Sequence, residues 1–164
     1  HPGNCIIDKE GNFVFIDNGA ICHAPPMISG ALFRFFEHLS NSELESAFEA
    51  LLGVSKKQLS EKRKRKYMNT MYGIYQDFEM RSVGEQSLTQ IMMNTVRCAV
   101  EIAGADFGEE AFPIIRALMY LDGLVIRTHP DVKLIRSMSP YLEEFRTSLP
   151  IPEPTEELVQ QISH

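Results

Sequence analysis

The sequence is short of cysteine, of net positive charge and of long apolar runs, and each shortage excludes a class of protein. Its three cysteines are an odd number without a Cys-x-x-Cys pair, which indicates a reducing, intracellular compartment rather than a disulfide framework. Sixteen basic residues against 22 acidic ones give a formal net charge of -6, so we expect no nucleic-acid partner. No apolar run reaches the roughly 18 to 20 residues of a membrane span.

The chain has enough apolar sequence for one core. At 164 residues and 44% hydrophobic composition, it is long enough for one globular unit and too short for two ordinary domains. We find no repeat at a fixed period. The fold class that we predict is mainly α, with a short β-hairpin followed by six or seven helices.

The hairpin is predicted at the start of the chain. Two runs rich in β-branched and aromatic residues, 5–8 and 13–16, flank a polar connector that contains Gly11, which is a hairpin pattern. If Asp8 faces Phe13 across the loop, Asn4 faces Asp17, with α-carbons about 5 Å apart. The run 13–16 is apolar on both faces, which predicts a strand that is covered on both sides.

Asn4 and Asp17 are the candidate metal ligands. A carboxylate and a neutral carbonyl oxygen suit Mg²⁺, which is usually bound together with waters and substrate phosphates. Protein kinases use this pair, an Asn at the end of the catalytic loop and the Asp of Asp-Phe-Gly, to hold Mg²⁺ against ATP. The alternative is that both residues only satisfy backbone groups near turns.

The start of the chain resembles a known family. His1-Pro-Gly-Asn4, followed by a hairpin and Ile16-Asp-x-Gly19, is similar to the catalytic segment of the UbiB/ADCK family of atypical protein-kinase-like proteins, which are linked to ubiquinone biosynthesis. Phosphotransferases of the aminoglycoside and choline kinase type share His-Pro-x-Asn. A second similarity, in residues 116–123, 129–131 and 140–142, favours UbiB/ADCK.

The resemblance implies a fold and an activity. Residues 1–148 would form a kinase-like C-terminal lobe, with the metal and ATP site in residues 1–24, a helical part in 25–148 and a Pro-rich tail in 149–164. Asn4 and Asp17 would hold Mg²⁺, and both residues with Gly19 would bind ATP. The parent would be a kinase or ATPase that supports isoprenoid-quinone synthesis. Its partners would be its own N-terminal lobe and a lipid or membrane surface, in a bacterial cytoplasm or a mitochondrion.

The same pattern shows what the chain lacks. The catalytic Asp of kinases would stand two positions before His1, and the ATP-gripping Lys belongs to an N-terminal lobe. We therefore expect a fragment that is inactive alone.

His1 falls where many kinases carry a Lys near the transferring phosphate, which makes it a catalytic candidate; a terminal His without a role is the alternative. Asn18 replaces the Phe of Asp-Phe-Gly. This replacement leaves open the possibility that the protein is a pseudokinase, which would serve as a non-catalytic helical interaction module. A small-molecule phosphotransferase is the third possibility.

Apolar spacing predicts the helices. They cover about residues 26–39, 44–52, 55–80, 86–103 and 109–128, and Pro140 divides a last region into two. Capping patterns support several of the ends: Ser42 with Glu45, Ser55 with Gln58, Gly53 and Gly104. The basic run 62–66 is either a solvated helix start or a surface for anionic lipid. The apolar positions from Tyr67 to Phe78 are either core or a ligand groove.

Overall fold

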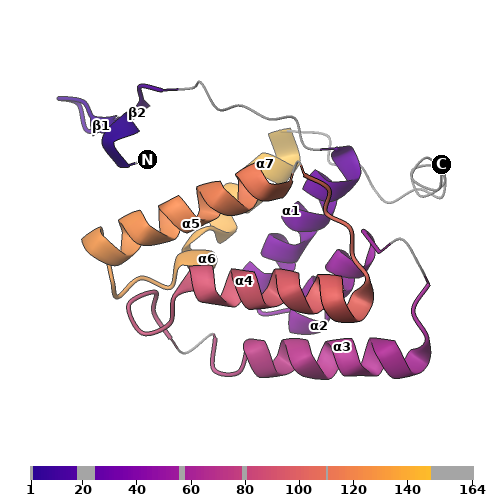
Figure 1. The fold of residues 1–164 in the computed structure, drawn as a ribbon. Coiled ribbons are helices and arrows are strands. Elements are labelled where there is room, and N and C mark those ends of the chain that lie inside the picture. The colour runs from indigo at the N-terminus through magenta and orange to yellow at the C-terminus, as the bar shows by residue number, and fades with distance from the viewer. Residues whose placement is uncertain (1, 18–24, 56–57, 79–80, 110, 149–164) are drawn as a thin grey trace.

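The helical prediction is confirmed. A computed structural model describes residues 2–17, 25–55, 58–78, 81–109 and 111–148, and over these residues the chain is mainly α (Figure 1). The tail 149–164 lies outside the described residues. A 3₁₀ turn, η1 (Pro2–Asn4), precedes strands β1 (Cys5–Ile7) and β2 (Phe13–Phe15). The helices are α1 (Pro26–Ser40), α2 (Leu44–Leu52), α3 (Glu61–Ile74), α4 (Leu88–Cys98), which the π-helical η2 (Ala99–Ala103) continues, α5 (Ala111–Thr128), α6 (Leu134–Ser137) and α7 (Ser139–Ser148).

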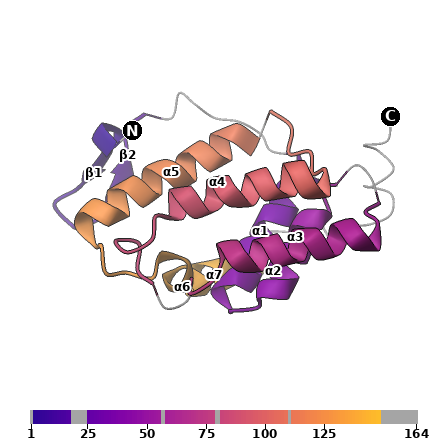
Figure 2. The same cartoon turned by 60° about the horizontal axis from the view of Figure 1, so that its bottom comes forward.

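The helices form a layered body. α3, α4 and α5 follow one another across one side, and α1, α2, α6 and α7 lie behind them (Figures 1 and 2). α1 packs on α2, α6 and α7, and α4 packs on both α3 and α5. The two-stranded antiparallel hairpin lies outside this body, on the side of α5 (Figures 1 and 2). None of the described helices is both long and apolar enough to cross a membrane.

Aromatic side chains fill the core between α1, α2 and α3. Phe35, Phe48 and Tyr67 are fully buried, and Tyr75 is 2% exposed. The Tyr67 hydroxyl donates a hydrogen bond of 2.9 Å to the Phe48 carbonyl, and the Tyr75 hydroxyl lies 2.9 Å from Thr95 Oγ1. Burial raises the pKa of both tyrosines above its usual range. The predicted stripe between Tyr67 and Phe78 is therefore mainly core, and the basic run before it is a largely exposed helix start.

Several predicted helix ends are confirmed. α1 begins at Pro26, whose missing N–H costs nothing in a first turn. Gly104 follows η2 with φ 67°, the left-handed conformation that closes many helices. α5 carries Pro113 in its first turn, and α6 gives way to α7 just before Pro140.

The predicted capping box of α2 is wrong. Ser42 has φ 66° and its N–H donates to the Leu39 carbonyl, while the Glu43 N–H donates to the His38 carbonyl. This pair of bonds is a Schellman motif that closes α1, so Ser42 is not available to cap α2. The N-cap is Glu43, without a side-chain cap. Gly53, expected in a left-handed conformation, has φ −61°.

The predicted start of α3 at Ser55 is also wrong. Ser55 forms an isolated bridge with Ala105, and its Oγ donates to the Ala103 carbonyl at 3.1 Å. These contacts hold Ser55 in extended backbone beside the end of η2, so it cannot cap a helix. Ser60 takes that role, and its Oγ accepts the Arg63 N–H.

Candidate functional site

The hairpin loop is built around the Asp8 carboxylate. It accepts the backbone N–H groups of Glu10 and Asn12 at 3.0 and 2.7 Å, and Asn12 Nδ2 at 2.9 Å. The side-chain bond from Asn12 is the main reason that the pKa of Asp8 lies below its usual value. Gly11 has φ 87°, a conformation that favours glycine. Asp8 and Asn12 therefore close a three-residue loop.

This loop corrects the predicted register by one residue. Asp8 was expected to face Phe13, but its N–H donates to the Asn12 carbonyl at 3.0 Å. The strands consequently pair Cys5 with Phe15, Ile6 with Val14 and Ile7 with Phe13. In this register Asn4 lies opposite Ile16, whose N–H donates to the Asn4 carbonyl at 2.9 Å.

Asn4 and Asp17 meet in spite of the changed register. Asn4 Nδ2 donates a hydrogen bond of 3.1 Å to Asp17 Oδ2. Asp17 is exposed and Asn4 is half-buried. Thus two of the four predicted site residues lie together at the open end of the hairpin. The other two, His1 and Gly19, lie outside the described residues.

Asn4 and Asp17 suit a Mg²⁺ ion that also binds a phosphorylated ligand better than a Mg²⁺ ion that is held by protein ligands alone. Asp17 offers carboxylate oxygens, and the amide oxygen of Asn4 is a second hard ligand atom. Within the described part of the chain, no group of three or more His, Cys, Asp or Glu side chains could hold a metal ion. Mg²⁺ commonly binds one or two protein oxygens and takes its remaining ligands from phosphates and water. The pair is therefore suited to a metal that arrives with a phosphorylated ligand.

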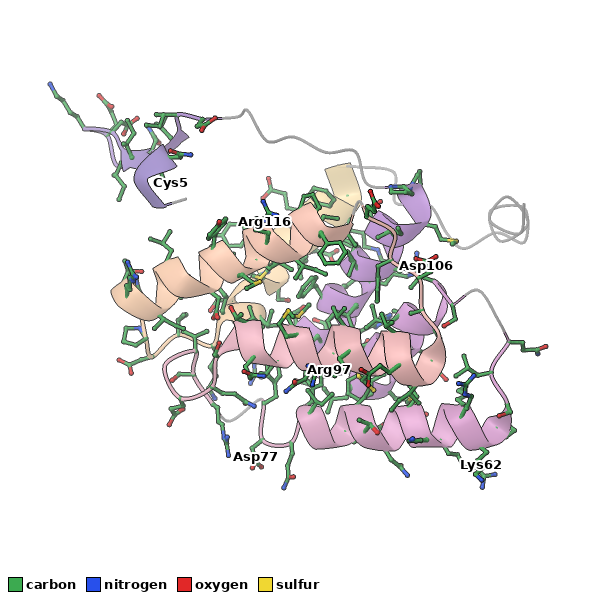
Figure 3. The ribbon with its side chains drawn as sticks, in the orientation of Figure 1. Cys5, Lys62, Asp77, Arg97, Asp106 and Arg116 are labelled. Carbon is green, nitrogen blue, oxygen red and sulfur yellow. The ribbon has the colours of Figure 1, made fainter. Side chains whose placement is uncertain are left out.

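The prediction that residues 13–16 are covered on both sides is wrong at Ile16, which is 58% exposed. On the other strand, Ile6 and Ile7 are 49% and 70% exposed. Cys5, on β1, is half-buried (Figure 3). The hairpin exposes apolar side chains beside a polar pair.

Sequence reasoning missed the most deeply buried carboxylate. Asp122 on α5 is 1% exposed and accepts hydrogen bonds from the N-terminus of α4: Thr89 N at 2.8 Å, Thr89 Oγ1 at 2.6 Å, Leu88 N at 3.2 Å and Ser87 Oγ at 3.1 Å. A carboxylate suits the partial positive charge of a helix N-terminus. The signal in the sequence was an acidic residue on the same helical stripe as Ala111 and Ile115.

Cys98 is another buried titratable group that lies outside the candidate site. It is 4% exposed, and burial raises the pKa of its thiol to about 11. A thiol with a raised pKa carries little thiolate at neutral pH and reacts slowly. Cys98 is therefore a structural thiol rather than a reactive one.

Comparisons with family models, with curated proteins and with solved structures found no match to this chain.

Proposed function

We propose that the chain is the C-terminal lobe of an ATP- and Mg²⁺-dependent kinase or ATPase of the UbiB/ADCK type, in which Asn4 and Asp17 bind the metal. The 3.1 Å hydrogen bond between the two side chains carries the proposal. It shows that the Asn of the His-Pro-Gly-Asn motif lies beside the Asp of the Ile-Asp-x-Gly motif, and two ligands of one metal ion must lie this close. Mg²⁺ would neutralise phosphate charge there. Support of isoprenoid-quinone synthesis is the part of the proposal that rests on the resemblance alone.

The exposed apolar side chains of the hairpin support the proposal that another part of the parent protein covers it. Ile7 is the most exposed isoleucine of the three on this element, at 70%, and exposed apolar groups on a strand favour coverage by another part of a protein. In the proposed parent, the N-terminal lobe covers the hairpin and supplies the catalytic Asp and the ATP-gripping Lys. The isolated chain therefore lacks the groups that would grip ATP.

Nucleotide binding by a longer protein tests the proposal. A chain that restores the upstream residues should bind ATP in a Mg²⁺-dependent manner by isothermal titration calorimetry. Asp17→Ala should weaken this binding by at least about tenfold, equivalent to roughly 1.4 kcal/mol. The matched control is Glu10→Gln, an exposed acidic residue at the other end of the hairpin, which should bind as the wild type does.

The outcomes separate the alternatives. Phosphate transfer to a small amino or hydroxyl compound by the longer protein would favour a small-molecule phosphotransferase. A folded longer protein that binds no Mg-ATP would refute the enzymatic proposal. It would favour the second candidate, a non-catalytic interaction module.

Exposed apolar side chains on α5 favour that second candidate. Phe112, Tyr120 and Leu121 are 67%, 51% and 38% exposed. The exposed Arg116 lies on the side of the helix away from α4 (Figure 3). An interaction module would bind its partner through such a face, and nucleotides would leave that binding unchanged.

A further inference from the structure

A pocket lies on the helical body and includes no residue of the hairpin. It is formed where the end of α1, the connection between α3 and α4, and α6 come together, and it opens to solvent. Its apolar wall includes Leu39, Leu88 and Ile135, each 3% exposed. These core residues fix one wall of the pocket.

Backbone contacts hold two of the pocket's segments together. The Val83 N–H donates to the Val132 carbonyl at 3.0 Å, and the Gly84 N–H donates to the Pro130 carbonyl at 2.8 Å. A Cβ on Gly84 would lie 2.9 Å from that carbonyl oxygen, so the close approach requires glycine. These bonds place the connection before α4 beside the segment that leads into α6.

Cationic side chains line the pocket although the chain as a whole is acidic. Arg81, Lys133 and Arg136 are among its lining residues. Two carboxylates lie close: Asp77 is 3.6 Å from Arg81, and Glu85 accepts the Ser82 N–H at 2.8 Å. Among the described residues, the pocket lining includes these three cations and no carboxylate, while Asp77 and Glu85 lie beside it. A lining of this kind favours anionic ligands.

The pocket also contains an unpaired acceptor. Gln86 lines it, and Gln86 Oε1 is buried with no hydrogen-bond partner in the described part of the chain. Buried polar atoms of native proteins are normally paired with protein, water or ligand. A ligand with an O–H or N–H group would supply the missing donor once the Gln86 side chain turns its buried Oε1 toward the pocket.

We infer that this pocket binds a small organic anion, a carboxylate or phosphate, that carries an apolar body and one hydrogen-bond donor. Lys133 and Arg136 attract the anionic group, the leucine and isoleucine wall contacts the apolar body, and Gln86 Oε1 accepts from the donor. This site is separate from the proposed nucleotide site, since it shares no residue with the hairpin.

Four probes separate these contributions. Mandelate has the anion, the hydroxyl and the ring; phenylacetate lacks the hydroxyl, 1-phenylethanol lacks the charge, and lactate lacks the ring. Titration of the isotope-labelled chain, followed by NMR at the amides of Val83, Gln86 and Ile135, should give saturable shifts with mandelate and weaker binding with each of the others. Phenyl phosphate, compared with phenylacetate, shows whether phosphate or carboxylate is preferred. The absence of saturable shifts with mandelate, phenylacetate and phenyl phosphate at about 10 mM, well above a millimolar dissociation constant, would overturn the inference.

Variants test the individual roles. Lys133→Gln and Arg136→Gln should each weaken mandelate binding about fivefold to tenfold without changing 1-phenylethanol binding. Gln86→Met should reduce mandelate to the affinity of phenylacetate. Arg97→Gln is the matched control, because this exposed cation lies on α4 outside the pocket (Figure 3). Circular dichroism confirms that each variant is folded.

Two further results would contradict the assignment. One is equal binding of mandelate and 1-phenylethanol, which would remove the role of charge. The other is loss of mandelate binding in Asp17→Ala, which would place the ligand at the hairpin. Retained mandelate binding in that variant, with Mg-ATP binding lost in the longer protein, would support two separate sites.

Discussion

The helical body and the hairpin differ in what holds them together. In the body, Phe48 and Tyr67 are fully buried and are joined by a hydrogen bond. In the hairpin, Ile7 is 70% exposed, and the most densely bonded group is the carboxylate of Asp8 in the loop. The body is stabilised by burial of apolar surface, and the hairpin by local hydrogen bonds. Changes in the candidate metal site should therefore affect ligand binding more than the stability of the helices.

The largest effect is expected in the aromatic core. Phe48→Ala removes a fully buried ring that contacts Tyr72 and Tyr75, and should lower the free energy of unfolding by about 4 kcal/mol because of lost burial and the remaining cavity. Urea denaturation followed by circular dichroism measures it. Ile7→Ala in the hairpin should change the same free energy by less than about 0.5 kcal/mol. Equal losses in the two variants would show that the hairpin and body unfold as one unit.

A smaller loss of unfolding free energy is expected for substitutions at the junction of α4 and α5. Asp122→Ala leaves the N–H groups of Leu88 and Thr89 without their acceptor, which should cost about 2 to 3 kcal/mol. Asp122→Asn keeps one accepting oxygen but turns an NH₂ group toward donors. Its unfolding free energy should therefore lie between those of the wild type and Asp122→Ala. Asp131→Ala, at an exposed acidic residue, is the control. An unchanged unfolding midpoint in Asp122→Ala would contradict the capping role.

The smallest effect concerns the hairpin loop and its dependence on pH. The pKa of Asp8 is lowered from its usual value of 3.8, so its hydrogen bonds stabilise the hairpin fully above that value. The stabilisation is lost as the pH falls through the lower folded-state pKa. NMR of the Gly11 and Asn12 amides should report loop opening in this acidic range. Asp8→Asn should remove the transition, and a transition that persists in this variant would assign it to another group.

Sequence patterns predicted the local elements better than the contacts between them. The helices were located by periodic apolar positions, and several helix ends by Pro26, Gly104 and Pro140. Proline and glycine mark helix ends reliably because they act through their own backbone conformations. The start of α3 was misplaced because Ser55 is engaged by the distant Ala103 carbonyl. The register was misplaced because the side chain of Asp8 bonds across the loop. A residue with two possible local roles cannot be assigned from spacing alone.

The sequence by itself determined that the chain is mainly helical, that a hairpin opens it and that Asn4 and Asp17 come close. Their contact survived a one-residue change of register because both side chains lie at the same open end of a short hairpin. Only the tertiary structure placed Asp122 at the N-terminus of α4 and gathered Arg81, Lys133 and Arg136 around one pocket. The physical reason is sequence separation, because such groups meet only when the packing of several helices brings distant segments together.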